Sequence, residues 1–206
     1  MGRNEGLFNA IGKGDRDTVR KIVEEQISAG EDIVDLLNNS MIPAMRDMGE
    51  KFSRNEAYVP DMLIAARAMQ TGLDLIGPLL EKSGHKSAAK VCIGTIKGDL
   101  HDIGKNLVAM MLKGAGYEVI DLGVDCDINK YDQAVSEGAQ AVMCSALLTT
   151  TMPYMKTVVE HFKDRPDVLV IIGGAPVTQE YAEEIGADGY GTDANQAVKV
   201  IENQLR

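Results

Sequence analysis

The sequence predicts an α/β protein in which an N-terminal helical bundle precedes a flavodoxin-like, doubly wound sheet of five parallel strands. Apolar residues recur at helical spacing through residues 5–80, whereas short apolar runs alternate with helical stretches from Lys90 onward. A polar stretch at 81–88 separates the two patterns. We therefore expect a helical domain at residues 1–83, a linker at 84–89 and a sheet domain at 90–206.

In the N-terminal half, apolar side chains recur every three or four residues in four stretches that we expect to be helices: 15–27, 31–37, 41–52 and 60–80. Asp15 lies at the start of the first stretch, where aspartate commonly caps a helix. Pro60 opens the last stretch, at a position that tolerates proline. A small bundle of four or five helices follows.

In the C-terminal half, the apolar runs that we expect to be strands lie at 91–96, 117–122, 141–145, 168–172 and 189–191. Each run is followed by a helical stretch, and right-handed crossovers then give a parallel, doubly wound sheet. Five strands at this length favour the order 2-1-3-4-5. The switch point of that order, where ligands bind, lies between the first and third strands.

Composition excludes several classes of function. The 206 residues carry a formal net charge of −10, which argues against binding a nucleic-acid backbone. The N-terminus has no apolar leader and no run of about 18 apolar residues occurs, so we expect a cytoplasmic protein with no membrane partner. Three cysteines without a CxxC spacing are expected to be core residues in a reducing compartment.

The turn after the first predicted strand carries the most informative residues of the chain. Residues 98–104 place His101 two residues after Asp99, at the edge of the sheet where ligands dock. Gly104 lies in the first turn of the following helix, where glycine is costly unless a ligand approaches the backbone. The alternative is that Asp99 or Asp102 caps the helix and that the histidine is solvated.

Small and hydroxyl-bearing residues follow the third and fourth predicted strands. Ser145 to Thr151 and the pair Gly173-Gly174 together suggest a slot for a ligand that passes beside the sheet. Read separately, the first segment could be a helix N-cap before Pro153 and the second an ordinary turn.

Three motifs in order, Asp99-x-His101-x-x-Gly104, Ser145-x-Leu147 and Gly173-Gly174, resemble the cobalamin-binding domain of methionine synthase, base-off corrinoid mutases and methyl-carrying corrinoid proteins. The helical half is similar to the cap domain of the methyl carriers, in the segments 48–52 and 56–60. The resemblance covers nearly the whole chain. Length and domain order are similar to stand-alone corrinoid proteins that serve methylamine, methanol, betaine or methoxyaromatic methyltransferases.

The resemblance implies a cobalamin or related corrinoid cofactor, with His101 as the lower axial ligand of cobalt. Asp99 would bond the second imidazole nitrogen, and the hydroxyl of Thr151 would complete the relay, with threonine in place of serine. Other residues that the resemblance assigns to the cofactor are Gly98, Leu100, Asp102, Gly104, Ser145, Leu147, Thr149, Gly173, Gly174 and Ala194. In the cap, Tyr58 would lie over the methyl group, and helix geometry adds Met62.

The function that the resemblance implies is that of a methyl carrier, which is not a complete enzyme alone. Its partners would be a substrate-specific methyltransferase and a second methyltransferase that passes the methyl group to tetrahydrofolate or a thiol, with a reductive activase as an optional third. Three alternatives stay open: a cobalamin-dependent sensor, the small subunit of a corrinoid mutase, and a generic flavodoxin-like domain that binds flavin or phosphate.

Overall fold

The computed structural model describes residues 2–82 and 87–205 and divides into two compact units. The first unit is Met1–Ser87 with Gly114–Gly116, and the second is Ala88–Lys113 with Tyr117–Arg206. Residues 84–86 of the expected linker lie outside the described residues, and β1 begins at Lys90. The position of the boundary therefore stays a prediction.

The first unit is helical, as the sequence predicts. Its elements are α1 (Glu5–Gly12), α2 (Arg16–Ser28), α3 (Ile33–Leu36), a π-helical segment η1 (Leu37–Met41), α4 (Ile42–Ser53) and α5 (Val59–Lys82). Asp15 caps α2, because its carboxylate accepts a hydrogen bond from the Thr18 N–H at 3.1 Å. The long helix α5 contacts α1, α2, α3 and α4, so it forms the centre of this unit.

Methionines fill the interior of the helical unit. Met41, Met45, Met48, Met62 and Met69 are each at most 5% exposed. A Cβ atom on Gly72 would lie 2.6 Å from Met41 Cε, so the end of this methionine packs directly against the backbone of α5. The methionine stripe is therefore mainly a packing feature, which suits a flexible side chain that fits irregular gaps.

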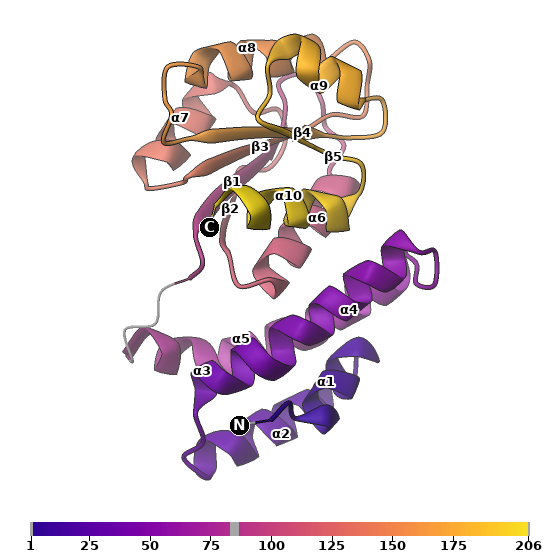
Figure 1. Cartoon of the computed structure of the whole chain (residues 1–206), viewed down its shortest axis with the longest axis vertical. Helices are drawn as coiled ribbons and strands as arrows, with labels where there is room; N and C mark the ends of the chain where they lie inside the picture. Colours follow the sequence, from indigo (N-terminus) through magenta and orange to yellow (C-terminus); the bar gives the residue numbers. More distant parts are fainter. Residues whose placement is uncertain (1, 83–86, 206) are drawn as a thin grey trace. The chain divides into compact units, whose positions relative to one another are not determined.

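The second unit is an open parallel sheet with strand order β2-β1-β3-β4-β5, which confirms the predicted order. The strands are β1 (Lys90–Thr95), β2 (Glu118–Asp121), β3 (Ala141–Ser145), β4 (Leu169–Gly173) and β5 (Gly189–Gly191). The helices are α6 (Ile103–Gly114), α7 (Ile128–Ser136), α8 (Pro153–Phe162), α9 (Gln179–Ile185) and α10 (Ala194–Gln204). Helices α7, α8 and α9 cover one face of the sheet, and α6 and α10 cover the other (Figure 1).

The core under α7, α8 and α9 contains all three cysteines, which are buried and free. Burial raises the pKa of Cys92 to about 12 and the pKa of Cys144 further still, so both are protonated thiols at neutral pH. They behave as small apolar residues, as the sequence suggests. No helix in the described ranges is both long and apolar enough to cross a bilayer.

An ion pair between a buried lysine and a partly exposed aspartate joins α6 to the end of β2. Lys105 is 2% exposed and its ammonium bonds the carboxylate of Asp121, which also accepts the Gly123 N–H at 2.9 Å. Burial alone would raise the pKa of Asp121, but the bonds from Lys105 and Gly123 outweigh it and lower that pKa. The pair fixes the exit of β2 against the helix that follows the His101 turn.

We expect Lys105→Met to lower the free energy of unfolding by roughly 1–2 kcal/mol. The loss is smaller than for a fully buried pair, because Asp121 remains partly solvated when its partner is removed. Urea denaturation at pH 7 measures it, and Lys163→Met, at an exposed position at the end of α8, is the control. Equal midpoints for the two variants would contradict a stabilising role for the pair.

Candidate functional site

The candidate site lies at the carboxyl ends of β1 and β3, the neighbouring strands where the strand order reverses. In the sheet register Thr95 of β1 pairs with Ser145 of β3, and Ser145 pairs with Gly173 of β4. The loops that leave these three strands therefore begin side by side. This is the position at which doubly wound sheets bind their ligands.

The carboxylate of Asp99 joins the loop after β1 to the loop after β3. It is fully buried, and five donors surround it. Oδ1 lies 2.7 Å from His101 Nδ1 and accepts the His101 N–H at 3.1 Å. Oδ2 accepts the N–H groups of Leu147 and Leu148 at 2.8 and 3.2 Å, and lies 2.9 Å from the Thr151 hydroxyl. His101 and Thr151, which the resemblance joins to Asp99 as a relay, thus both contact its carboxylate.

The hydrogen bonds keep Asp99 ionised. Burial alone would raise the pKa of this carboxyl, but the Leu147 N–H, the His101 ring and backbone and the Thr151 hydroxyl outweigh it and hold the pKa well below the usual range. A fixed negative charge next to Nδ1 favours the tautomer in which Nδ1 carries the proton. A cap of α6 alone does not account for these contacts, because three of the five donors to Asp99 lie in the loop after β3.

The geometry makes His101 a candidate metal ligand. Its side chain is 51% exposed, and Nδ1 is engaged by Asp99, so the lone pair of Nε2 is left for a ligand. A histidine oriented by a carboxylate on its other nitrogen is a common arrangement in metal sites. The donor set therefore fits a metal that takes one axial imidazole.

Thr95 is a residue of the site that sequence reasoning missed. It is fully buried at the end of β1, and its hydroxyl donates to the His101 carbonyl oxygen at 2.8 Å. Its position near the end of the strand predicted at 91–96, just before the turn that carries the histidine, was the available signal. The bond ties the far end of the turn back to the sheet.

Exposed apolar side chains gather around His101. Among the described residues of the second unit, the large apolar side chains that are exposed are Leu100 (71%), Ile103 (77%), Leu147 (44%) and Leu148 (41%). Two flank the histidine along the chain, and the other two donate their N–H groups to Asp99. A concentrated apolar patch of this kind marks a binding surface, and around an exposed imidazole it suits a flat, apolar ligand that carries a metal. Leu148 and Ile103 were not singled out from the sequence.

The glycines that were expected to line a ligand slot differ in their surroundings. A Cβ atom on Gly104 would meet no atom within 4 Å, so open space adjoins this position. A Cβ atom on Gly174 would lie 1.9 Å from the Ala146 carbonyl oxygen, and one on Gly173 would lie 3.1 Å from that of Gly191. The packing of neighbouring loops therefore already requires Gly174, whatever binds there.

The remaining expected residues have these places. Gly98 precedes Asp99 with a φ of +84°, and Asp102 lies just before α6, where its carboxylate accepts a bond from the Asn106 amide at 3.0 Å. Ser145 ends β3, Thr149 is exposed in the loop after it, and Ala194 begins α10 and is 6% exposed.

In the helical unit Tyr58 is 64% exposed, whereas Met62 is fully buried. Met62 is thus part of the helical core and does not present its side chain to a ligand.

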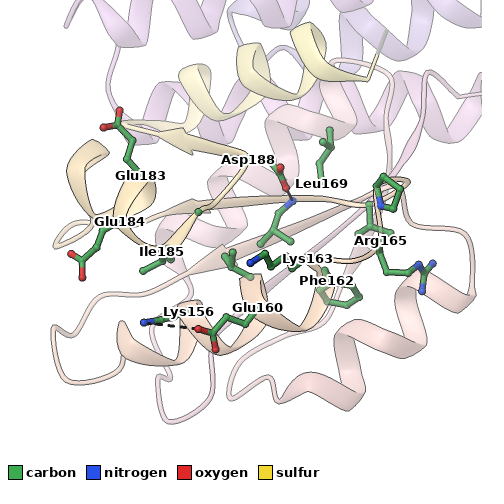
Figure 2. Close-up of a pocket in the computed structure, with 15 residues that line it drawn as sticks. Lys156, Glu160, Phe162, Lys163, Arg165, Leu169, Glu183, Glu184, Ile185 and Asp188 are labelled. Atoms are coloured by element: carbon green, nitrogen blue, oxygen red, sulfur yellow. Dashed lines mark hydrogen bonds and ion pairs between the residues drawn. The ribbon is translucent and has the colours of Figure 1, made fainter.

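A separate cavity of about 460 Å³ lies at the opposite end of the sheet, between α8, α9 and the start of β4 (Figure 2). Its charged lining residues are largely bonded to neighbours. Lys156 lies 3.9 Å from Glu160, Arg165 bonds Asp167, and the Asp188 carboxylate accepts the Val170 N–H at 2.7 Å. None of the expected site residues lines it.

Thr151→Val is expected to weaken the relay without breaking it. The Thr151 hydroxyl lies 2.9 Å from both Asp99 Oδ2 and the Leu148 carbonyl oxygen, so its single proton serves either acceptor. Asp99 keeps four donors in the variant, so we expect a loss of about 0.5–1.5 kcal/mol in the free energy of unfolding, with Thr151→Ser close to wild type. Urea denaturation tests this, with Thr157→Val on the exposed face of α8 as the control.

Comparison with protein families gives two matches to families described as a B12 binding domain. One match covers residues 89–199 and the other covers residues 3–76, so both units are included. The trimethylamine corrinoid protein of Methanosarcina barkeri is 43% identical over 202 residues, which are 95% of this chain and 93% of that protein. A corrinoid protein of Desulfitobacterium hafniense (strain Y51) is 37% identical over 206 residues, 97% of this chain and 94% of its own length.

Solved structures give the same result. A cobalamin-binding protein from Desulfitobacterium hafniense DCB-2 has a TM-score of 0.80 and 30% identity, with 97% of both chains covered. A chain of the methanol:cobalamin methyltransferase complex of Methanosarcina barkeri has a TM-score of 0.84 and 29% identity, with 97% of this chain and 78% of that chain covered. The generic flavin or phosphate alternative is thereby set aside, and this chain belongs to the family of B12-binding corrinoid proteins.

Proposed function

We propose that this protein carries a methyl group on a corrinoid between two methyltransferases, and that it receives the methyl group from a methylamine. The observation that carries the proposal is the exposed His101, oriented by the buried carboxylate of Asp99 within an apolar patch. The similarity to trimethylamine and dimethylamine corrinoid proteins, at 43% and 38% identity, supports methylamines as the substrate class. The protein is a carrier subunit and requires partner enzymes for both transfers.

In this role His101 would hold the cobalt of the corrinoid through Nε2. The cofactor supplies a metal centre that accepts a methyl group and gives it up again. Asp99 keeps the proton on Nδ1, so Nε2 stays available as a ligand, and the buried N–H donors of the β3 loop hold Asp99 in place. Leu100, Ile103 and Leu147 would cover apolar surface of the bound ligand and exclude water from the metal.

The helical unit contributes an exposed apolar group of its own. Among its described residues, the exposed large apolar side chains are Tyr58, Val59 and Ile64, all at the start of α5. We propose that Tyr58 contacts the methyl-bearing side of the cofactor. Hydrogen bonding of the Tyr58 N–H to the Asp61 carboxylate at 2.8 Å fixes the backbone that presents this ring.

Reconstitution tests the proposed function. Apoprotein is incubated with hydroxocobalamin, desalted without oxygen, and mixed with a reductant that keeps the cobalt reduced, a trimethylamine-specific methyltransferase and trimethylamine. We expect one corrinoid per chain and conversion of its visible spectrum to that of the methylated cofactor, and parallel reactions with dimethylamine, monomethylamine and methanol enzymes rank the donors. Failure to retain cobalamin, or retention without methylation by any of the four systems, would overturn the proposal.

The second transfer is tested with the methylated protein. A thiol-directed methyltransferase and a tetrahydrofolate-directed one are added in separate reactions, and loss of the methyl group from the cofactor is followed. Free methylcobalamin at the same concentration is the control for reaction outside the protein. We expect one of the two enzymes to demethylate the protein faster than it demethylates the free cofactor.

A further inference from the structure

We infer that Asp125, in the loop after β2, is a positioning residue for the His101 turn, and that it sets how completely His101 ligates the corrinoid. The inference rests on the proposed function, because it concerns the strength of that ligation. The feature that carries it is a reciprocal pair of hydrogen bonds between Asp125 and the backbone of Gly98 and Asp99. Asp125 would act through the turn, without touching the cofactor.

The two bonds run in opposite directions. The Gly98 N–H donates to Asp125 Oδ1 at 2.7 Å, and the Asp125 N–H donates to the Asp99 carbonyl oxygen at 3.0 Å. The bonded groups belong to the peptides on either side of the Gly98–Asp99 peptide, so the two bonds hold this two-residue segment at both ends. Asp99 in turn bonds the imidazole of His101, so the orientation of the ring depends on this segment.

The loop that carries Asp125 is itself held to β1 on both sides. The Thr95 N–H donates to the Gly123 carbonyl oxygen at 3.0 Å, and the Cys126 N–H donates to the Thr95 carbonyl oxygen at 2.9 Å. Lys130 Nζ also donates to the Val124 carbonyl oxygen at 3.0 Å. Asp125 therefore projects from a fixed support, which is what a residue needs in order to position another segment.

The backbone of Asp125 is specialised for this contact. Its φ of +50° lies in the left-handed region, which few residues other than glycine, asparagine and aspartate adopt at low cost. Glycine would take this conformation more easily, yet it would lack the carboxylate that accepts the Gly98 N–H. The need for a carboxylate therefore accounts for aspartate at this position. The left-handed backbone conformation also suits glycine and asparagine, which are the two informative substitutions.

A purely structural role would give a different result from a positioning role. Asp125 is exposed, so after removal of its carboxylate water can accept the bond from Gly98, and little stability is lost. What is lost is the restriction on the turn, because the peptide that leads into Gly98, one residue before Asp99, gains freedom. A less ordered imidazole pays a larger entropic cost to bind the metal, so His101 would ligate more weakly.

The test compares Asp125→Gly with Asp125→Asn in holoprotein reconstituted with methylcobalamin. Glycine accepts the backbone conformation and removes the acceptor, whereas asparagine keeps both the conformation and an acceptor oxygen. For Asp125→Gly we expect a three- to tenfold fall in the ratio of His-bound to His-free cofactor, about the value of one ordinary hydrogen bond. The pH at which His101 leaves the metal should then rise by about 0.5–1 unit, because weaker ligation competes less well with protonation.

The matched control is Asp127→Gly in the same loop. Asp127 caps α7 by accepting the Lys130 N–H at 3.3 Å and has no bond to the His101 turn. We expect Asp127→Gly and Asp125→Asn to keep the wild-type spectrum and pH midpoint, and the thermal midpoint of all three apoproteins to change little. If Asp125→Gly has the wild-type spectrum and midpoint, or if Asp127→Gly shifts them equally, the inference is wrong. Wild-type protein that shows no His-bound cofactor would instead overturn the proposed function.

Discussion

His101→Ala is expected to fold as the wild type does and to retain a corrinoid whose spectrum at neutral pH is that of the form without a lower ligand. The side chain is half exposed and packs against no core, so its removal should change the free energy of unfolding by less than about 1 kcal/mol. Asp99 keeps its bonds from Leu147, Leu148 and Thr151. The turn should therefore survive the loss of the ring.

The measurement is the visible spectrum of bound methylcobalamin between pH 5 and 9. Wild-type protein should be His-bound at neutral pH, and the variant should stay without a lower ligand across the whole range. His161→Ala is the control, because His161 is another partly exposed histidine with an aspartate partner, Asp132, at 2.8 Å. A His-bound spectrum in the His101 variant would remove His101 from the site.

The sheet and its functional edge could be predicted because their signals are local. Apolar runs gave the five strands to within one or two residues, for example 168–172 against the observed Leu169–Gly173. Short connections and crossover handedness then leave few topologies. The motif around His101 lies within seven residues of sequence, so its place at the switch point followed directly from the strand order.

Contacts between distant loops could not be predicted in the same way. Asp99 accepts N–H groups from Leu147 and Leu148, 48 and 49 residues further along, and a backbone donor leaves no mark in the sequence. Asp125 escaped notice for the same reason, since its partners are the backbone of Gly98 and Asp99. Helical spacing placed Met62 on an apolar stripe of α5, yet spacing alone does not tell a buried face from a binding face, and the side chain is buried.

Asp99→Asn is expected to abolish ligation by His101 at neutral pH as well as to destabilise the protein. An amide has one acceptor oxygen, and the two backbone donors of Leu147 and Leu148 cannot reverse their direction, so the oxygen should stay with them. The NH₂ group would then face His101 Nδ1, which could accept its hydrogen only in the tautomer that carries the proton on Nε2. That tautomer has no lone pair on Nε2 for a metal.

The result is measured with the same cofactor spectrum, and two variants separate the causes. Asp99→Asn should give the ligand-free spectrum at neutral pH, whereas Thr151→Val, which keeps the carboxylate, should remain largely His-bound. If Asp99→Asn were His-bound with an unchanged pH profile, Asp99 would have a structural role only.

The same substitution should reveal a pH-dependent contribution of Asp99 to stability. Its pKa in the folded protein lies below the ordinary value of 3.8, so the ionised group stabilises the fold fully at pH values well above 3.8. As the pH falls below 3.8 the unfolded chain takes up the proton first, and the stabilisation is lost towards the lower folded pKa. The substitution also leaves buried donors unsatisfied. We expect the free energy of unfolding of wild type and Asp99→Asn to differ by about 2–4 kcal/mol in urea denaturation at pH 7. The difference should be unchanged at pH 5.5 and clearly smaller at pH 3. A difference that grew on acidification would show that Asp99 is protonated in the folded protein, and that the hydrogen bonds around it do not hold a charge.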